Sequence, residues 1–228
     1  MGEIIEFPSN GSTGSGYIAL PHSGGGPGVL VVQEWWGLLP QITRVCDRLA
    51  AEGFVALAPD LYHGKQVPLT EPDEAAKEMM AMDMSRAAND LSGAVDELIR
   101  RSSSDKAAVV GFCMGGGLAL VLACRRPESL NAVVPFYGVI PWPDAQPDYS
   151  RIQAPVLGHF AELDSFFTPD LARKLETELK GLGKDAEFHI YEGVDHAFFN
   201  EDRPEVYNPD AAQMAWQRTL AFLRRTRA

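Results

Sequence analysis

A cysteine at position 113 stands between two glycines, where a run of β-forming residues gives way to helix-forming ones. The stretch is VVGFCMGGGLAL, residues 109–120, and it contains the pattern glycine–x–nucleophile–x–glycine. Between a strand and a helix, this pattern lifts the central side chain above the sheet edge, close to backbone N–H groups that can bind an oxyanion. A helix N-terminus also favours thiolate over thiol. We interpret Cys113 as a nucleophile; the alternative is a small apolar residue that fills space beside a glycine-rich turn.

A nucleophile of this kind needs a base and a group that orients the base, which follow it along the chain in the order acid, histidine. His196, in EGVDHAFF, lies downstream of Cys113 just beyond a predicted strand, and Asp164, in HFAELDSFF, directly follows another. The alternatives are a loop histidine that binds a carbonyl and an aspartate that caps a helix. The competing aspartates lie in a proline-rich loop, in a helix first turn or next to the histidine: Asp144, Asp148, Asp170 and Asp195.

The elements that must position these side chains alternate along the whole chain. Strands are predicted over residues 3–7, 16–20, 28–33, 54–59, 107–112, 131–138, 154–162 and 186–191, and helices over 41–53, 71–80, 86–100, 114–125, 168–183 and 210–225. Such alternation predicts an α/β fold, a mostly parallel sheet of about seven or eight strands with helices on both faces, in one domain over residues 1–228. Chemistry gathers at the carboxyl ends of such strands, where all three candidates lie, and the loops 60–82 and 138–153 should supply the pocket walls.

Composition narrows the range of partners and compartments. With 31 acidic and 20 basic residues the net charge is −11, which argues against nucleic acid or an anionic membrane surface as a main partner. The three cysteines form no CxxC pair, so we expect no zinc site and no disulfide framework. No apolar run is long enough to span a membrane and no secretory signal is evident, which favours a cytoplasmic protein. We expect no metal or organic cofactor. We also expect a monomer or a weak homo-oligomer.

The motifs together resemble the dienelactone hydrolase (carboxymethylenebutenolidase) family, cysteine members of the α/β-hydrolase fold. GFCMGG is similar to that family's nucleophile motif, AELDSFF to its acid segment, GVDHAFFN to its histidine segment and VVQEWWG to a segment at the end of an early strand. The resemblance covers residues 3 to about 225. It implies that Cys113 is the nucleophile, His196 the base and then the acid, and Asp164 the group that orients the histidine.

The same resemblance assigns roles around the thiol. Glu34 would contact the resting thiol and take part in its activation, and the backbone N–H groups of Met114 and Trp35 would form the oxyanion hole. A carboxylate near the thiol disfavours a second negative charge, so the cysteine can rest neutral and resist oxidation. The alternatives are a solvated glutamate at a strand end and tryptophans that belong to the core. Residues proposed to touch substrate are Trp36, Phe199 and Arg203.

One departure concerns the substrate. In the family, members that cleave dienelactone hold its carboxylate with arginines, one of them four residues after the catalytic histidine, where this chain has Asn200. The second arginine has no match, since residues 60–82 contain only Lys65 and Lys77. Arg203 is the nearest substitute and could equally be a surface ion-pair partner. Dienelactone itself is therefore in doubt, although ester or lactone cleavage is not.

The sequence thus predicts a hydrolase that cleaves an ester or lactone bond of a small molecule through an acyl-enzyme on Cys113. A thioesterase or acyltransferase that uses the same thiol is the second hypothesis. The third is a non-catalytic domain whose thiol senses oxidants or binds a ligand. Cys124, along the helix that follows, is predicted to be a core residue rather than a resolving thiol, which weakens the sensor hypothesis.

Overall fold

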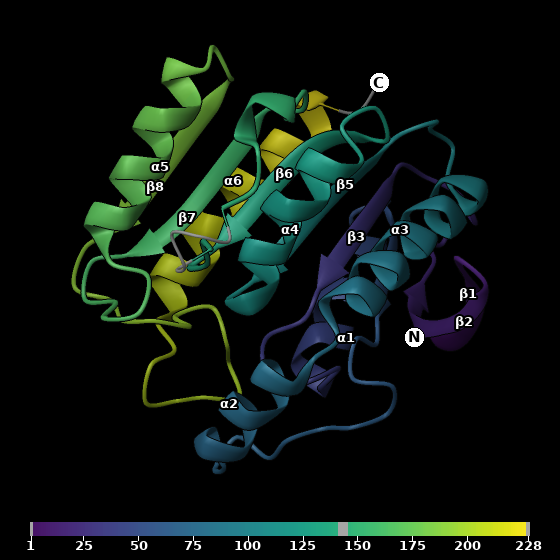
Figure 1. Cartoon of the computed structure of the whole chain (residues 1–228), viewed down its shortest axis with the longest axis horizontal. Coiled ribbons are helices and arrows are strands. Elements are labelled where there is room, and N and C mark those ends of the chain that lie inside the picture. The colour runs from purple at the N-terminus through teal and green to yellow at the C-terminus, as the bar shows by residue number, and fades with distance from the viewer. Residues whose placement is uncertain (1, 141–145, 227–228) are drawn as a thin grey trace. The chain divides into compact units, whose positions relative to one another are not determined.

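The computed structural model describes residues 2–140 and 146–226 and shows a mostly parallel sheet (Figure 1). The eight described strands follow the order β1-β2-β4-β3-β5-β6-β7-β8. β3 and β4 are parallel, as are β6–β7 and β7–β8, whereas β2 runs antiparallel to both β1 and β4. The predicted α/β class and strand number are confirmed. The strands are β1 Glu3–Ser9, β2 Ser12–Ala19, β3 Gly28–Val32, β4 Val55–Pro59, β5 Ala107–Phe112, β6 Leu130–Phe136, β7 Val156–Ala161 and β8 Ala186–Tyr191.

The chain forms two compact units, residues 1–109 and 110–228, and the boundary falls inside β5. In the first unit, α1 packs against β2, β3 and β4, and α3 packs against β1 to β4. The prediction of one domain over the whole chain stays a prediction. The helices of this unit are α1 Pro40–Ala51, α2 Pro72–Ala81 and α3 Met84–Arg101.

In the second unit, helices cover both faces of the strands. α4 packs against β6, α5 against β7 and β8, and α6 against β6 and β7. Figure 1 shows α6 behind these strands and α4 and α5 in front of them. The helices are α4 Met114–Arg125, α5 Pro169–Gly181 and α6 Pro209–Thr226, with a short 3₁₀ helix, η2, at Tyr149–Arg151.

Local sequence explains where the elements begin. Every residue of β3, β5 and β7 is buried, as expected for strands covered on both faces. Asp83 caps α3 by accepting from the N–H groups of Ser85 and Arg86. Thr168 caps α5, and Pro169 occupies its first turn, where a missing N–H costs nothing. Within residues 2–140 and 146–226, no helix combines the length and hydropathy that crossing a membrane requires.

Candidate active site

Cys113 occupies a strained turn between β5 and α4. Its φ is 53° and its ψ is −118°, a combination that side chains with a Cβ rarely adopt. The turn is held by its own backbone, since the Cys113 N–H donates to the carbonyl of Phe136 at 3.0 Å and its carbonyl accepts from Gly116 at 2.9 Å. The predicted strand–turn–helix setting is present, and the cysteine stands at the first turn of α4.

Two glycines are required for steric reasons around this turn. A Cβ added to Gly111 would lie 2.0 Å from the carbonyl oxygen of Gly115, and one added to Gly138 would lie 1.9 Å from the carbonyl oxygen of Cys113. Neither backbone can move aside cheaply, so both positions exclude a side chain. Gly111 belongs to the sequence motif, whereas Gly138 follows a different strand and became evident only from the structure.

Asp164 lies three residues after the end of β7 and is buried. Its Oδ1 accepts hydrogen bonds from the N–H groups of Phe166 and Phe167, at 2.8 and 2.9 Å. Its Oδ2 lies 2.7 Å from Nδ1 of His196. The carboxylate therefore fixes its own loop with one oxygen and the histidine ring with the other.

His196 follows β8, and its ring has protein groups on several sides. The ring makes edge contact with Tyr137, with centroids 5.1 Å apart, and hydrogen-bonds to the side chain of Cys113. Burial disfavours the imidazolium, but the negative charge of the Cys113 thiolate and the hydrogen bonds to Asp164 and Cys113 outweigh it and raise the pKa of His196 to about 10. The surroundings within this unit therefore favour the protonated imidazole.

The loops that carry the acid and the histidine are tied to each other. The Glu162 N–H donates to the carbonyl of Tyr191 and the Leu163 N–H to that of Val194, both at 2.9 Å. The Gly193 N–H in turn donates to Oε2 of Glu162 at 2.8 Å. These bonds extend the β7–β8 pairing beyond the strands and so fix the spacing between Asp164 and His196.

Of the other residues predicted near the thiol, Glu34, Trp35 and Trp36 belong to the first unit and Met114 belongs to the second. Glu34 follows β3 and is buried. Trp36 is buried in a cluster with Val67 and Ala75, and Trp35 packs against it. The proposed roles of Glu34 with the thiol, of Trp35 and Met114 in the oxyanion hole, and of Trp36 in binding substrate stay predictions. Met114 is the first residue of α4.

Phe199 and Arg203, both predicted to bind substrate, contact other side chains of the protein. Phe199 is buried in an aromatic cluster, with ring centroids 5.3 Å from Phe112 and 5.1 Å from Phe136. Arg203 forms an ion pair with Glu205, whose Oε1 is 2.8 Å from its Nε. Their contact with a substrate stays a prediction.

Four other aspartates were alternatives to Asp164 as the acid that orients the histidine. Asp144 lies outside the described residues. Asp148 caps η2 by accepting from the N–H of Ser150, and Asp170 forms an exposed ion pair with Arg173. Asp195 accepts from the N–H of His196 at 2.6 Å, a bond to the backbone rather than to the ring.

The remaining thiols are buried and free. Burial raises the pKa of Cys46 far above its usual range and that of Cys124 to about 11, so both stay protonated at neutral pH. Buried protonated thiols are poor nucleophiles. In the part of the chain that is described, no group of three or more His, Cys, Asp or Glu side chains could hold a metal ion.

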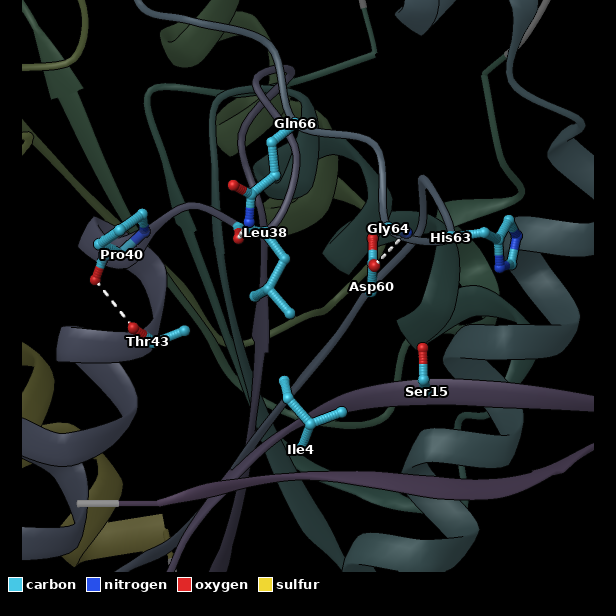
Figure 2. A pocket seen from close by; sticks show the side chains of 9 residues that line it. All are labelled: Ile4, Ser15, Leu38, Pro40, Thr43, Asp60, His63, Gly64 and Gln66. Atoms are coloured by element: carbon cyan, nitrogen blue, oxygen red, sulfur yellow. Dashed lines mark hydrogen bonds between the residues drawn. The ribbon is translucent and has the colours of Figure 1, made fainter.

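The first unit contains a pocket of about 470 Å³ at the carboxyl ends of β3 and β4 (Figure 2). Asp60 accepts from the N–H groups of Tyr62 and Gly64, and the Gln66 amide donates to the carbonyl of Leu38 at 2.6 Å. The loop 60–82 therefore contributes to the wall of this pocket, while its predicted place in the wall of the substrate pocket stays a prediction. No candidate site residue lines it, and sequence reasoning did not single out its lining residues: Ile4, Ser15, Leu38, Pro40, Thr43, Asp60, His63, Gly64 and Gln66.

Comparison with known proteins identifies the family. Residues 15–227 match the model of the dienelactone hydrolase family. The chain belongs to this family. It is 42% identical to "Protein usf" of Aquifex pyrophilus over 98% of both chains, and 38% identical to a "Putative carboxymethylenebutenolidase" of Aquifex aeolicus (strain VF5), again over 98% of both.

A solved structure extends the comparison to the fold. The "Putative Dienelactone Hydrolase" from Klebsiella pneumoniae subsp. pneumoniae MGH 78578 superposes with a TM-score of 0.87 at 29% identity, over 98% of both chains. The chain is therefore a dienelactone hydrolase-like hydrolase with the α/β-hydrolase fold. The predicted resemblance is confirmed.

Proposed function

We propose that this dienelactone hydrolase family member cleaves ester or lactone bonds of small molecules with Cys113 as nucleophile, His196 as proton carrier and Asp164 as orienting group. The observation that carries the proposal is the chain of two hydrogen bonds centred on the His196 ring, one to the Cys113 side chain and one to Asp164 Oδ2 at 2.7 Å. A nucleophile, a base and a third group in this relation are the parts that covalent catalysis requires.

In the first half-reaction the Cys113 thiolate attacks the carbonyl carbon, and a carbon–sulfur bond forms. The carbonyl oxygen becomes an oxyanion, for which the N–H of Met114 at the start of α4 is a suitable donor. When the intermediate collapses, the bond to the alcohol oxygen breaks. His196 gives its proton to that oxygen, and the alcohol leaves or, from a lactone, stays attached to the acyl chain.

In the second half-reaction a water molecule attacks the thioester carbonyl. His196, now neutral, takes one proton from the water while the hydroxyl adds to carbon. The carbon–sulfur bond breaks, the thiolate returns and the protonated histidine stands beside it again. The sum is ester plus water to acid plus alcohol, and no metal or cofactor takes part in these steps.

Two other functions use the same thiol. A thioesterase or an acyltransferase would follow the same first half-reaction, and an acyltransferase would differ in the acceptor that replaces water. A redox sensor needs only the thiol and has no use for a histidine held by a buried aspartate. The hydrogen-bonded arrangement therefore favours catalysis over sensing.

The test is hydrolysis of p-nitrophenyl acetate, neutral lactones and a lactone carrying a carboxylate by wild type, Cys113→Ala and Cys113→Ser. We expect turnover in wild type, loss of more than about a thousandfold in both variants, and a thioester adduct on Cys113 by mass spectrometry after rapid quenching. Circular dichroism establishes that the variants fold. Turnover in folded Cys113→Ala equal to that of wild type would contradict the proposal.

A further inference from the structure

Two large apolar side chains are exposed in the short loop that carries Asp164. Leu163 exposes 58% of its surface and Phe166 exposes 64%, while Asp164 between them is buried. Single exposed apolar residues are common on protein surfaces, but such residues gathered at a functional group are typical of a binding surface. We call Leu163 and Phe166 the apolar loop surface.

This surface adjoins the histidine of the proposed catalytic group. The ring centroids of Phe166 and Phe167 both lie 5.6 Å from that of His196. Tyr137 also contacts the ring, but it is buried. Phe166 is therefore an aromatic neighbour of His196 that combines contact with the imidazole and a largely open ring face.

The chemistry of His196 determines which part of an ester would reach Phe166. Nδ1 is bonded to Asp164, so Nε2 is the nitrogen that can carry a proton to the leaving oxygen. Proton transfer requires that oxygen within about 3 Å of the nitrogen. A ring whose centre is 5.6 Å from the imidazole centre is near enough for an alcohol portion that extends beyond this oxygen to reach.

Charge around the same loops restricts the alcohol portion further. Residues 162–168 and 192–198 contain four carboxylates and no lysine or arginine. An anionic alcohol portion would meet like charges at short range, which costs binding energy, whereas a neutral one would not. These carboxylates are Glu162, Asp164, Glu192 and Asp195.

We infer that the apolar loop surface is the subsite for the alcohol portion of the substrate, and that this portion is neutral and apolar. Phe166 is then a specificity-determining residue that contacts the carbons next to the leaving oxygen. The inference rests on the proposed function, because it takes His196 as the group that protonates that oxygen. It adds a substrate class: esters of neutral, apolar alcohols.

The experiment measures kcat/KM for two ester series by titrating the released acid at constant pH. One series lengthens the alcohol, from ethyl to butyl to hexyl acetate, and the other lengthens the acid, from ethyl acetate to ethyl hexanoate. For wild type we expect a gain of roughly twofold per CH₂ along the alcohol series, about half the effect of full burial, because the ring is open on one side. In Phe166→Ala this gain should disappear while the dependence on the acid is unchanged. Phe166→Leu should keep part of the gain.

Leu182→Ala, at an exposed leucine beyond the end of α5, is the matched control and should behave as wild type in both series. The inference is overturned when Phe166→Ala keeps the wild-type gain along the alcohol series, or loses both dependences equally. The sedimentation coefficients of wild type and Phe166→Ala are compared as well. A difference between them would assign the surface to contact with a second copy of the chain and would also overturn the inference. Cys113→Ala, assayed on the same esters, separates a failure of the proposed function from a failure of the subsite. Activity that persists in Cys113→Ala removes the proposed function itself. If Cys113→Ala is inactive, the Phe166 variants alone decide the subsite.

Discussion

The two carboxylate oxygens of Asp164 have separate partners, which separates the structural task of the residue from its chemical one. Oδ1 accepts from two backbone N–H groups of its own loop, and Oδ2 accepts from Nδ1 of His196. An asparagine at this position can keep the first set of bonds through its carbonyl oxygen. Its amide nitrogen cannot accept a hydrogen bond from the imidazole. The substitution is therefore a test of orientation with little change in the loop.

We predict that Asp164→Asn lowers kcat by about a thousandfold or more while the protein stays folded, because the imidazole loses the partner that sets its tautomer. Loss of the carboxylate also removes a cause that raises the pKa of His196, so that pKa should fall. Ester hydrolysis against pH and the chemical shift of the His196 ring check both effects. Asp170→Asn is the control, since the Asp170 side chain is exposed. A kcat for Asp164→Asn within tenfold of wild type would rule out the orienting role.

Glu34 offers a second prediction for a single residue, based on the family motif. We propose that its negative charge disfavours the thiolate of Cys113 in the resting enzyme. Glu34→Gln should then increase the thiolate fraction near neutral pH and speed alkylation by iodoacetamide by roughly fivefold, a change of about 1 kcal/mol. Thiolate absorbance near 240 nm, corrected with Cys113→Ala, gives an independent measure. Equal alkylation rates in Glu34→Gln and wild type would remove this role.

At the scale of elements, sequence patterns predicted most of what the structure contains. Continuous apolar runs became buried strands, and the helix predicted at 41–53 begins at Pro40 and ends at Ala51. The motif placed Cys113, Asp164 and His196 after strands, where the structure has them. Contacts that join distant segments could not be predicted, because they depend on side-chain direction: the Gly138 approach to Cys113 and the burial of His159 are examples.

His159 links three elements of the second unit. Its Nδ1 lies 2.9 Å from the hydroxyl of Tyr191 at the end of β8, and its Nε2 lies 3.0 Å from that of Thr219 on α6. Burial lowers its pKa well below the usual value, so the folded protein holds it neutral. Below about pH 6.5 the unfolded chain binds a proton there that the folded chain does not. The stability of the wild type therefore declines as pH falls through this range.

We predict that His159→Gln is less stable than wild type at pH 8 by about 1–3 kcal/mol, because glutamine replaces the two hydrogen bonds imperfectly. The deficit should shrink by up to about 1.4 kcal/mol per pH unit as pH falls below 6.5, since glutamine does not titrate. Urea unfolding at pH 8, 6.5 and 5.5 measures the free energy of unfolding. His22→Gln, at an exposed position, is the control variant. A deficit that stays constant with pH would show that His159 does not stay neutral in the folded protein.

At the scale of the whole molecule, the net charge of −11 bears on which substrates reach the site. A negative protein lowers the local concentration of an anion unless a cluster of cations draws it in. Asn200, which stands where the family has an arginine, is buried. The guanidinium of Arg203, the nearest substitute, is paired with Glu205. The charges on this chain therefore disfavour a lactone that carries a carboxylate and leave a neutral ester unaffected.

Salt dependence tests this argument, because added ions screen the charge of the whole molecule. Between 20 and 200 mM NaCl the screening length falls from about 20 Å to about 7 Å. We predict that kcat/KM for a carboxylated lactone rises roughly threefold over this range, while the value for ethyl acetate stays constant and serves as the control. A decrease with salt would mean that local cations outweigh the net charge. Arg203→Gln would then abolish the decrease, since Arg203 is the cation nearest in sequence to His196 on its C-terminal side.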